Sequence, residues 1–468
     1  MYGIDSSPSP QAVSRRHQDP SHPATEAAHS IQCTRVIILA LLLIWAGFAR
    51  AASPAIESGS NLSFAALDVF STSPSDQNPP VVISQPHTMP PEKTSIEETA
   101  TGAWWGVRDQ LQNDGIWLGA TWVMEGFQNF RGGIDTEPTV MASTTTAHVG
   151  LDLHKLFGWP GGEVYLDLQD HGGRNPSHLL VGDLQIFDKF NSAPFLQIDE
   201  FWYQQELFAG ALRVKIGKVD ANTEFSVIDN GLPFLSSSTQ VSPTIFVFPT
   251  FPDPMPSINV FFTPNEPFYA SFGAYYANKS DHALDFFGRP YEAQHSTGGT
   301  LFLGETGTFW HEAPWLGHDG NLRLGIWGHT GTFKRFDRSH QHGAMGFYTI
   351  GNQTLWQPRA DDRGVRMFLE FAHAQRSVSP IDWHGGGGFT WTGLIRFRPH
   401  DIIGFSPQYV HLSDENGFTY SYEAALEVFY QMKLTPWFRI QPDLQYIIHP
   451  GGRHPNALMG TLRLGLDL

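Results

Sequence analysis

Charged and aromatic side chains recur at alternate positions of the same segments of this chain. Carboxylates and guanidinium groups exchange hydrogen bonds with hydroxyl groups, and an aromatic ring packs against the C–H face of a sugar. A wall with charges of one sign would select ions, whereas a mixed wall with rings suits neutral polyols. The side chains that we expect to contact such a solute are Asp167, Glu200, Trp202, Arg213, Lys215, Arg366 and Glu370.

The motifs of enzymes and metal sites are absent from the sequence. The chain contains 21 histidines, but none stands in the H-E-x-x-H pattern of zinc enzymes or has a cysteine partner for a metal site. Neither a G-x-S-x-G turn nor a phosphate-binding glycine loop occurs. We therefore expect no metal, no cofactor and no catalytic residues. Because catalytic pairs can form from residues far apart in sequence, an outer-membrane barrel enzyme stays open as an alternative.

The charge balance excludes one class of partner. Lys and Arg number 29 against 46 Asp and Glu, which gives a formal net charge of −17. A nucleic-acid-binding protein would have the opposite balance, so we exclude nucleic acid as a partner. Charged residues make up only 16% of the chain, which contains 46 Gly, 35 Phe and 14 Trp. This composition is typical of many strands joined by turns.

The first part of the chain has the pattern of an export signal. An apolar run at residues 36–46 follows Arg35 and precedes Ala49 and Ala51, which form an A-x-A cleavage pattern. The run is shorter than the roughly 20 residues of a membrane-spanning helix, which disfavours a membrane anchor. We assign residues 1–51, with the single cysteine, to a cleaved signal peptide. Residues 52–101, which are acidic and rich in Pro and Ser, are expected to form a flexible periplasmic extension.

Residues 116–468 show a two-residue alternation of apolar and polar side chains, which predicts strands. The segments 163–169, 212–216, 365–371 and 438–446 each separate an apolar face from a face with charged side chains. The last segment is the clearest, because four leucines alternate with Thr461, Arg463, Gly465 and Asp467. Residues 102–113 predict one short helix before the first strand.

Alternation alone is also compatible with a secreted β-sandwich or solenoid. Three features favour a membrane barrel: strands of about ten residues, charges of both signs on the polar face, and Trp and Tyr near strand ends. The length available allows roughly 14 to 18 strands. The rings assigned to interfacial girdles are Trp117, Trp122, Trp202, Tyr203, Trp327, Tyr430 and Trp437.

Two further expectations concern the inside of such a barrel. The alternation assigns Trp202, Phe368 and Phe429 to the inner face, and Arg396 and Arg398 to the charged lumen wall. Residues 243–256 contain too many prolines for an interior strand. This stretch is either a surface loop or a loop that folds into the barrel and narrows the pore.

Five segments follow one another along the chain in a recognisable order. They are residues 105–119, residues 200–208 with 215–222, the proline-rich residues 249–256 with 262–267, residues 429–437, and residues 440–452. In this order they resemble the carbohydrate-selective outer-membrane porins of the OprB type. The two segments nearest the C-terminus are the most specific matches, and the resemblance covers nearly all of residues 102–468.

The resemblance implies an all-β fold, namely a transmembrane antiparallel β-barrel of about 16 strands with a short N-terminal helix. It implies a porin in a Gram-negative outer membrane that lets small carbohydrates diffuse passively into the periplasm. Outer-membrane lipid would surround the barrel. The protein would be a monomer or a homotrimer. A general, non-selective porin is the main alternative, and a secreted sugar-binding β-protein is a more distant one.

Overall fold

The computed structural model of the protein describes residues 96–265, 267–277, 296–311, 318–358 and 363–468, all within the unit Gln77–Leu468. The predicted signal peptide, the single cysteine and most of the predicted extension lie outside the described residues. Within the described ranges, no helix has the length and apolar character needed to cross a membrane.

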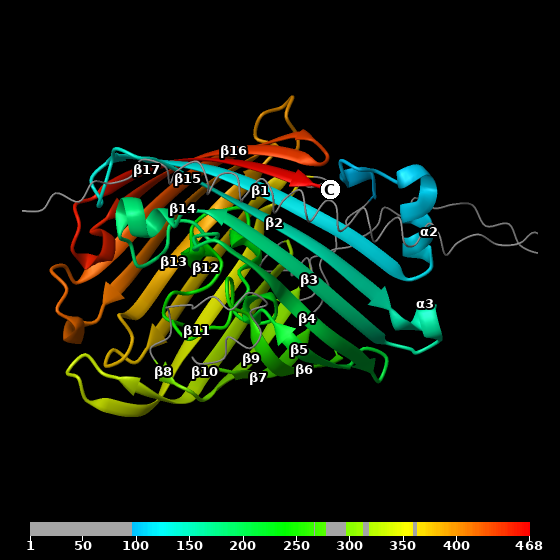
Figure 1. The fold of residues 1–468 in the computed structure, drawn as a ribbon, viewed down its shortest axis with the longest axis horizontal. Coiled ribbons are helices and arrows are strands. Elements are labelled where there is room, and N and C mark those ends of the chain that lie inside the picture. Colours follow the sequence, from blue (N-terminus) through cyan, green and yellow to red (C-terminus); the bar gives the residue numbers. More distant parts are fainter. Residues whose placement is uncertain (1–95, 266, 278–295, 312–317, 359–362) are drawn as a thin grey trace, which may run out of the picture. The chain divides into compact units, whose positions relative to one another are not determined.

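The described strands form one antiparallel sheet that closes on itself (Figure 1). β1 pairs with β2 on one side and with β17 on the other, so no edge is left open. The strands are β1 (Ile116–Arg131), β2 (Thr139–Asp152), β3 (Gly162–Gly173), β4 (Phe195–Leu207), β5 (Leu212–Val219), β6 (Met255–Asn265), β7 (Phe268–Tyr276), β8 (Ser296–Thr297), β9 (Thr300–Trp310), β10 (Gly320–Lys334), β11 (His340–Trp356), β12 (Gly364–Ala374), β13 (Ile381–Thr392), β14 (Ile402–Leu412), β15 (Tyr422–Thr435), β16 (Phe438–Ile448) and β17 (Ala457–Asp467).

The barrel has the predicted number of strands. β8 and β9 both pair with β10 and are separated only by Gly298 and Gly299, so they share one position in the wall. The 17 strands of the described residues therefore occupy sixteen positions. The prediction of an all-β barrel of about 16 strands is confirmed.

Short helices lie only in the connections of the described chain. They are η1 (Ile96–Glu98), η2 (Trp104–Gly106), α2 (Val107–Asn113), α3 (Leu153–Phe157), η3 (Ser177–Val181), η4 (Ala221–Thr223), η5 (Asp229–Gly231), η6 (Ser237–Thr239), η8 (Asp414–Asn416) and η9 (Pro450–Gly452). η2 and α2 confirm the helix predicted before the first strand. Trp105 and Gly106 have φ values of 57° and 91°, in the left-handed region, so η2 and α2 are separate pieces.

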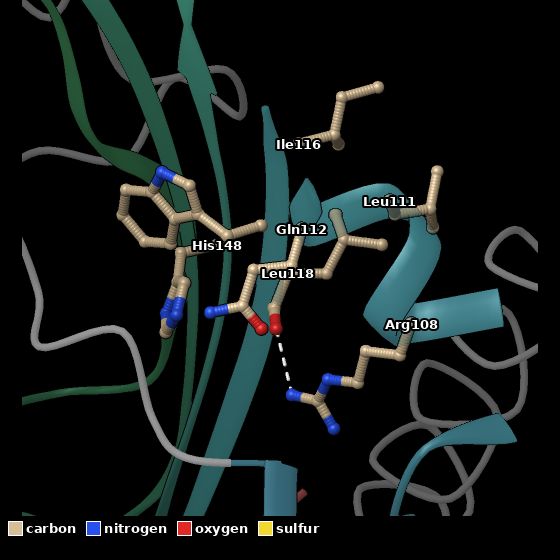
Figure 2. A pocket seen from close by; sticks show the side chains of 7 residues that line it. Arg108, Leu111, Gln112, Ile116, Leu118 and His148 are labelled. Carbon is tan, nitrogen blue, oxygen red and sulfur yellow. Dashed lines mark hydrogen bonds between the residues drawn. The ribbon is translucent and has the colours of Figure 1, made fainter. Parts of the chain in front are cut away.

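Arg108 of α2 fastens this first segment to the barrel. Its guanidinium donates hydrogen bonds to the carbonyl oxygens of Leu118, at 2.7 Å, and Leu468, at 3.2 Å. Figure 2 shows the bond to Leu118, with Gln112 and His148 beside it. The cavity that these residues line measures about 10 Å³, which is room for one water and not for a sugar.

The two faces of the sheet differ as the alternation predicts. In β10, Leu324 and Ile326 point outward with exposed fractions of 52% and 68%, whereas Arg323, next to Leu324, points inward and is 1% exposed. The faces predicted for residues 163–169, 212–216, 365–371 and 438–446 are confirmed in the same way. Apolar side chains outside and charged side chains inside are the arrangement of a membrane barrel, which excludes the soluble sandwich.

The predicted aromatic girdle is wrong for three of its rings. Trp117, Trp202 and Trp327 are buried, because the alternation places them on the inner face with the charged residues. Several inward rings lie flat against a glycine of the neighbouring strand. A Cβ atom at Gly150 would be 1.8 Å from the Trp117 ring, and one at Gly346 would be 2.5 Å from the Trp327 ring. The glycines therefore leave room for rings to lie along the wall instead of across the lumen.

The connections at the two ends of the barrel differ in length. α2 and α3 lie at one end (Figure 1), together with short turns such as residues 208–211. The opposite end has the connections 174–194, between β3 and β4, and 220–254, between β5 and β6. We call the second of these, residues 220–254, the lumen loop.

Replacing Gly150 by alanine tests whether the glycine positions the Trp117 ring. The new Cβ forces the ring off the wall, and overpacking of this kind costs about 1–3 kcal/mol. We expect the G150A barrel, purified in detergent, to lose its heat-modifiable gel mobility at a lower temperature than the wild type. Gly126 is the matched control, because a Cβ there meets nothing within 4 Å. Equal shifts for G150A and G126A would contradict this account.

Candidate functional site

The lumen loop lies inside the barrel and is held by side chains of distant strands. Glu427 of β15 accepts hydrogen bonds from the backbone N–H groups of Leu235 and Ser236, at 2.5 and 3.1 Å. Asn352 of β11 accepts one from the N–H of Asn230, at 3.0 Å. Because inward-facing side chains of the wall make these bonds, the loop is fixed in the lumen.

The proline-rich part of the lumen loop is also inside. Ile245 and Val247 are buried, and Phe246 packs edge-on against the rings of Trp327 and Phe333. Of the two interpretations of residues 243–256, the surface loop is wrong and the loop folded into the barrel is confirmed. Pro256 itself belongs to β6, where it pairs with Lys218 near the start of the strand.

A second group of contacts fixes the lumen loop to β9, β10 and β11. Glu305 accepts hydrogen bonds from the hydroxyls of Tyr269 and Tyr348, at 2.9 and 2.7 Å, and from the N–H of Ser226 in the loop, at 3.0 Å. Arg323 forms an ion pair of 2.7 Å with Asp229 of the loop. The inward charges of this wall are thus partnered by the loop.

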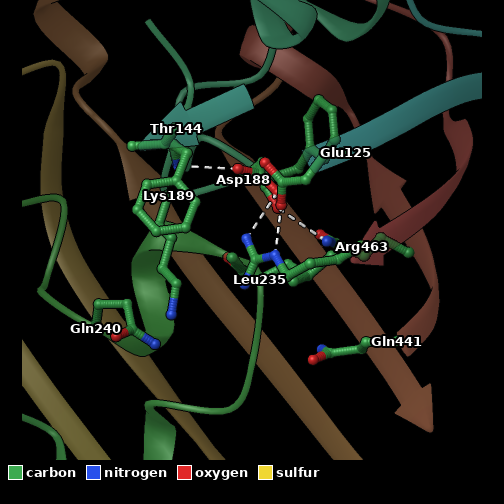
Figure 3. Close-up of polar contacts among 12 residues, drawn as sticks. Glu125, Thr144, Asp188, Lys189, Leu235, Gln240, Gln441 and Arg463 are labelled. Atoms are coloured by element: carbon green, nitrogen blue, oxygen red, sulfur yellow. Dashed lines mark hydrogen bonds and ion pairs between the residues drawn. The ribbon is translucent and has the colours of Figure 1, made fainter. Parts of the chain in front are cut away.

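The connection 174–194 covers the wall formed by β1, β15, β16 and β17. Arg463 pairs with Glu125 at 2.5 Å and with Asp188 of this connection at 3.3 Å (Figure 3). Glu423 accepts the N–H groups of Leu184 and Gln185, at 3.0 and 2.9 Å. Two connections therefore occupy the lumen. The wall formed by β3, β4 and β5 faces the start of the lumen loop.

On that wall, two cations meet one carboxylate. Arg213 donates to both carboxylate oxygens of Glu224, at 2.8 and 3.2 Å, and Lys215 forms an ion pair with the same group. Arg213 and Lys215 come from β5, and Glu224 comes from the lumen loop just after η4. All three side chains are buried. We call Arg213, Lys215 and Glu224 the Glu224 clasp.

The carboxylate of Glu224 remains charged over a wide pH range. Burial alone would raise the pKa of Glu224, but the neighbouring cations of Arg213 and Lys215 lower it to about 2. Because this pKa is depressed, the ion pair is intact above the usual carboxyl range and is lost only as the pH falls towards 2. The start of the lumen loop is therefore fixed to β5 at neutral pH.

Aromatic rings cover the two cations and continue along the wall. The Lys215 ammonium lies 3.9 Å from the centre of the Trp202 ring, and the Arg213 guanidinium lies 3.7 Å from that of Phe261. Trp202 stacks on Tyr165 at 5.0 Å, and Tyr165 stacks on Trp117 at 5.5 Å. Rings of β1, β3 and β4 thus lead from the clasp towards the end of the barrel that carries α2.

Carboxylates gather on the other side of the clasp because β4 contains a bulge. Leu166 pairs with Phe201 and Leu168 with Ile198, so Asp199 and Glu200 both stand opposite Asp167. Glu200 accepts a hydrogen bond of 2.8 Å from the N–H of Asp220, where the lumen loop begins. Burial raises the pKa of Asp220 to about 6, although three groups donate hydrogen bonds to its carboxylate. This part of the lumen is therefore acidic, next to two cations.

The structure brings together five of the seven predicted solute-contacting residues. Those five lie on the inner faces of β3, β4 and β5: Asp167, Glu200, Trp202, Arg213 and Lys215. Arg366 and Glu370 also belong to the inner face, but of β12, on the far side of the barrel. Glu370 is buried 3.5 Å from Nδ1 of His384. These two residues are separate from the clasp.

Sequence reasoning missed one central residue and misplaced two others. Glu224 lies in a connection, where alternation carries no information, and only its position close behind the motif at residues 215–222 pointed to it. Arg396 and Arg398 are not in the lumen wall, because they belong to the turn between β13 and β14. There Arg398 pairs with Asp401 at 2.7 Å. Within the described residues, no three or more His, Cys, Asp or Glu side chains are arranged to hold a metal ion.

Comparisons with known proteins agree with this geometry. The chain is 25% identical over 422 residues to Porin B of Pseudomonas aeruginosa, an alignment that covers 78% of this chain and 90% of that protein. The fold is similar to the high-pH structure of Pseudomonas putida OprB, with a TM-score of 0.71 and 20% identity over 80% of this chain and 99% of that chain. The low-pH structure of the same protein matches with a TM-score of 0.54 over 79% of this chain and 98% of that chain.

The family model described as carbohydrate-selective porin, OprB family, matches residues 142–468. This match and the barrel fold indicate a channel rather than an enzyme. The matched residues include the lumen loop, the clasp, Tyr165 and Trp202, but not Trp117. The chain belongs to the OprB family of carbohydrate-selective porins.

Proposed function

We propose that small carbohydrates cross the outer membrane through this lumen by facilitated diffusion, and that the Glu224 clasp and Trp202 form the selective point. The observation that carries this proposal is the lumen loop, which presses Glu224 onto Arg213 and Lys215 beside an aromatic ring. Guanidinium, ammonium and carboxylate groups exchange hydrogen bonds with hydroxyls. No energy source is needed, because the solute moves down its concentration gradient.

Weak binding follows from the way the ring is covered. The Lys215 ammonium already occupies one face of Trp202, so a sugar that packs on this face must displace it. The sugar hydroxyls in turn replace part of the hydrogen bonding among the clasp residues. This exchange keeps the net affinity low, which a channel needs because the solute must also leave.

The orientation and processing of the chain complete the proposal. Outer-membrane barrels have short periplasmic turns and longer extracellular loops, so the end with α2 and α3 faces the periplasm. Outer-membrane lipid contacts the outward apolar side chains. We propose that residues 1–51 are removed on export and that residues 52–101 lie in the periplasm, so that the mature chain begins at Ala52. The barrel works as a monomer or a homotrimer.

Liposome swelling tests the function. Protein purified from outer membranes, with its N-terminus sequenced to establish the start of the mature chain, is reconstituted and challenged with glucose, a disaccharide and an amino acid of similar size to glucose. We expect faster swelling with glucose than with the amino acid, because the mixed charges and the ring recognise hydroxyls and C–H faces. Rates that depend on solute size alone would identify a general porin instead.

Charge substitutions test the place of the clasp in the pore. Changing Arg213→Gln and Lys215→Gln together leaves the Glu224 carboxylate beside Asp167, Asp199 and Glu200, so the reversal potential in a salt gradient shifts towards cations. Changing Glu224→Gln instead shifts it towards anions. Removing one partner of a buried ion pair costs about 3–5 kcal/mol, so we also expect noisier conductance as the lumen loop loosens.

Arg398→Gln is the matched control, because Arg398 has an ion pair of 2.7 Å but lies in a turn outside the lumen. This variant should keep the wild-type reversal potential. Wild-type selectivity in the clasp variants, with the barrel folded, would remove the clasp from the conducting path.

A further inference from the structure

A cleft of about 420 Å³ lies at the end of the barrel opposite α2. Three connections border it: the turn after β10 with Arg335, the turn after β12 with Arg376, and the turn after β14 with Glu415. Asp382 and Trp383, near the start of β13, also line it. None of these residues belongs to the clasp or to the lumen loop.

Hydrogen bonds between the connections hold the cleft open. The N–H of Phe336 bonds to the carbonyl of Ser377, at 3.3 Å, and the N–H of Ser413 bonds to that of Pro380, at 2.9 Å. The Ser413 hydroxyl also donates to the carbonyl of Arg376, at 2.6 Å. Because these bonds join all three turns, the cleft exists before any ligand binds.

Its polar half has hydrogen-bond donors to spare. Arg335 and Arg376 each lie 3.7 Å from Glu415, which is an ion-pair distance but too long for a hydrogen bond. Nε of Arg335 is buried and, within the described chain, has no hydrogen-bond partner. Two guanidinium groups with free donors suit a phosphate, and the carboxylate of Glu415 suits a hydroxyl or amine group, whereas Asp382 is already paired with His411 at 2.6 Å. A phosphorylated amino sugar offers all of these groups.

Its apolar half continues down the outside of the barrel. Trp383 is 39% exposed, and its ring centre lies 4.0 Å from His373 and 5.3 Å from Phe371. Phe371 lies 6.2 Å from Phe347, which is exposed on the same outer face. These rings form an apolar strip across β11, β12 and β13 on the outer face, next to the polar cleft. Such a strip fits acyl chains, and rings at a membrane interface bind where one side is polar.

We propose that this cleft binds the phosphorylated sugar headgroup of an outer-leaflet glycolipid, whose acyl chains lie along Phe371 and Phe347. The cleft suits an amphiphile better than a soluble sugar. It combines free guanidinium donors and a carboxylate with an exposed indole and an adjoining apolar strip. The proposal uses the orientation in which the long connections face outward from the cell, and it is independent of which solute the lumen passes.

Native mass spectrometry of the delipidated full-length mature protein tests the proposal. The probes are lipid A, phosphatidylglycerol and glucosamine 1-phosphate. We expect lipid A to bind the wild type more tightly than the other two. Loss of the charge-assisted bonds in the double variant R335Q/R376Q should weaken lipid A binding about tenfold or more. W383A should weaken it as well, with no change in sugar-driven liposome swelling.

R338Q is the matched control, because Arg338 lies in the same turn as Arg335 but does not line the cleft. Heat-modifiable mobility establishes that each variant is folded. Undiminished lipid A binding by R335Q/R376Q would overturn the proposal. Equal binding of phosphatidylglycerol would show a nonspecific lipid contact, and equal binding of glucosamine 1-phosphate would show a soluble-ligand site; either result rejects the glycolipid.

Discussion

Closure of the sheet is the constraint on which the rest of this structure depends. Hydrocarbon offers no water to unpaired backbone groups, so a strand edge cannot be left open in a membrane. The pairing of β1 with β17 removes that edge. Once the sheet is closed, every second side chain must point into the lumen and the others must point outward. The alternation of the sequence, the exposed outer leucines and the buried inner charges all follow from this geometry.

Closure creates a second problem, which is the burial of many charges inside one tube. Buried carboxylates are costly unless they receive hydrogen bonds or ion pairs. Glu427 and Glu305 receive backbone N–H groups of the lumen loop, and Arg323 receives the carboxylate of Asp229. The loop that narrows the pore is therefore also the loop that satisfies the wall. Narrowing the pore and stabilising the folded barrel rest on the same contacts.

The sequence predicted the features that depend on the two-residue periodicity of strands. Its predictions were less accurate in the connections, where that periodicity ends. The inward positions of Trp202, Phe368 and Phe429 were correct, because the register of a closed sheet leaves only two faces. Arg398 was misplaced because the alternation of apolar and charged residues continues past Thr392, where β13 ends, into the turn. Glu224 was missed because it lies in a long connection, and only the folding of that connection brings it to Arg213 of β5.

The aromatic residues show a second limit of prediction from sequence, which concerns the face of a strand on which a ring lies. Trp117 is near a strand end, as girdle residues are, whereas Trp327 lies at the middle of β10; their register turns both rings inward, onto Gly150 and Gly346. Position along a strand and face of the strand are independent properties, and only the second decides whether a ring meets lipid or lumen. The cleft at Trp383 depends on three turns that meet in space, which no single segment of the sequence predicts.

The central proposal is that the Glu224 clasp and Trp202 form the selective point of the pore. The most direct measurement is a crystal structure of the protein soaked with glucose at a concentration that slows ion conductance. Our account predicts a sugar ring against Trp202, with its hydroxyls within hydrogen-bond distance of Arg213, Lys215 or Glu224. A glucose bound elsewhere in the lumen, with the clasp undisturbed, would contradict it.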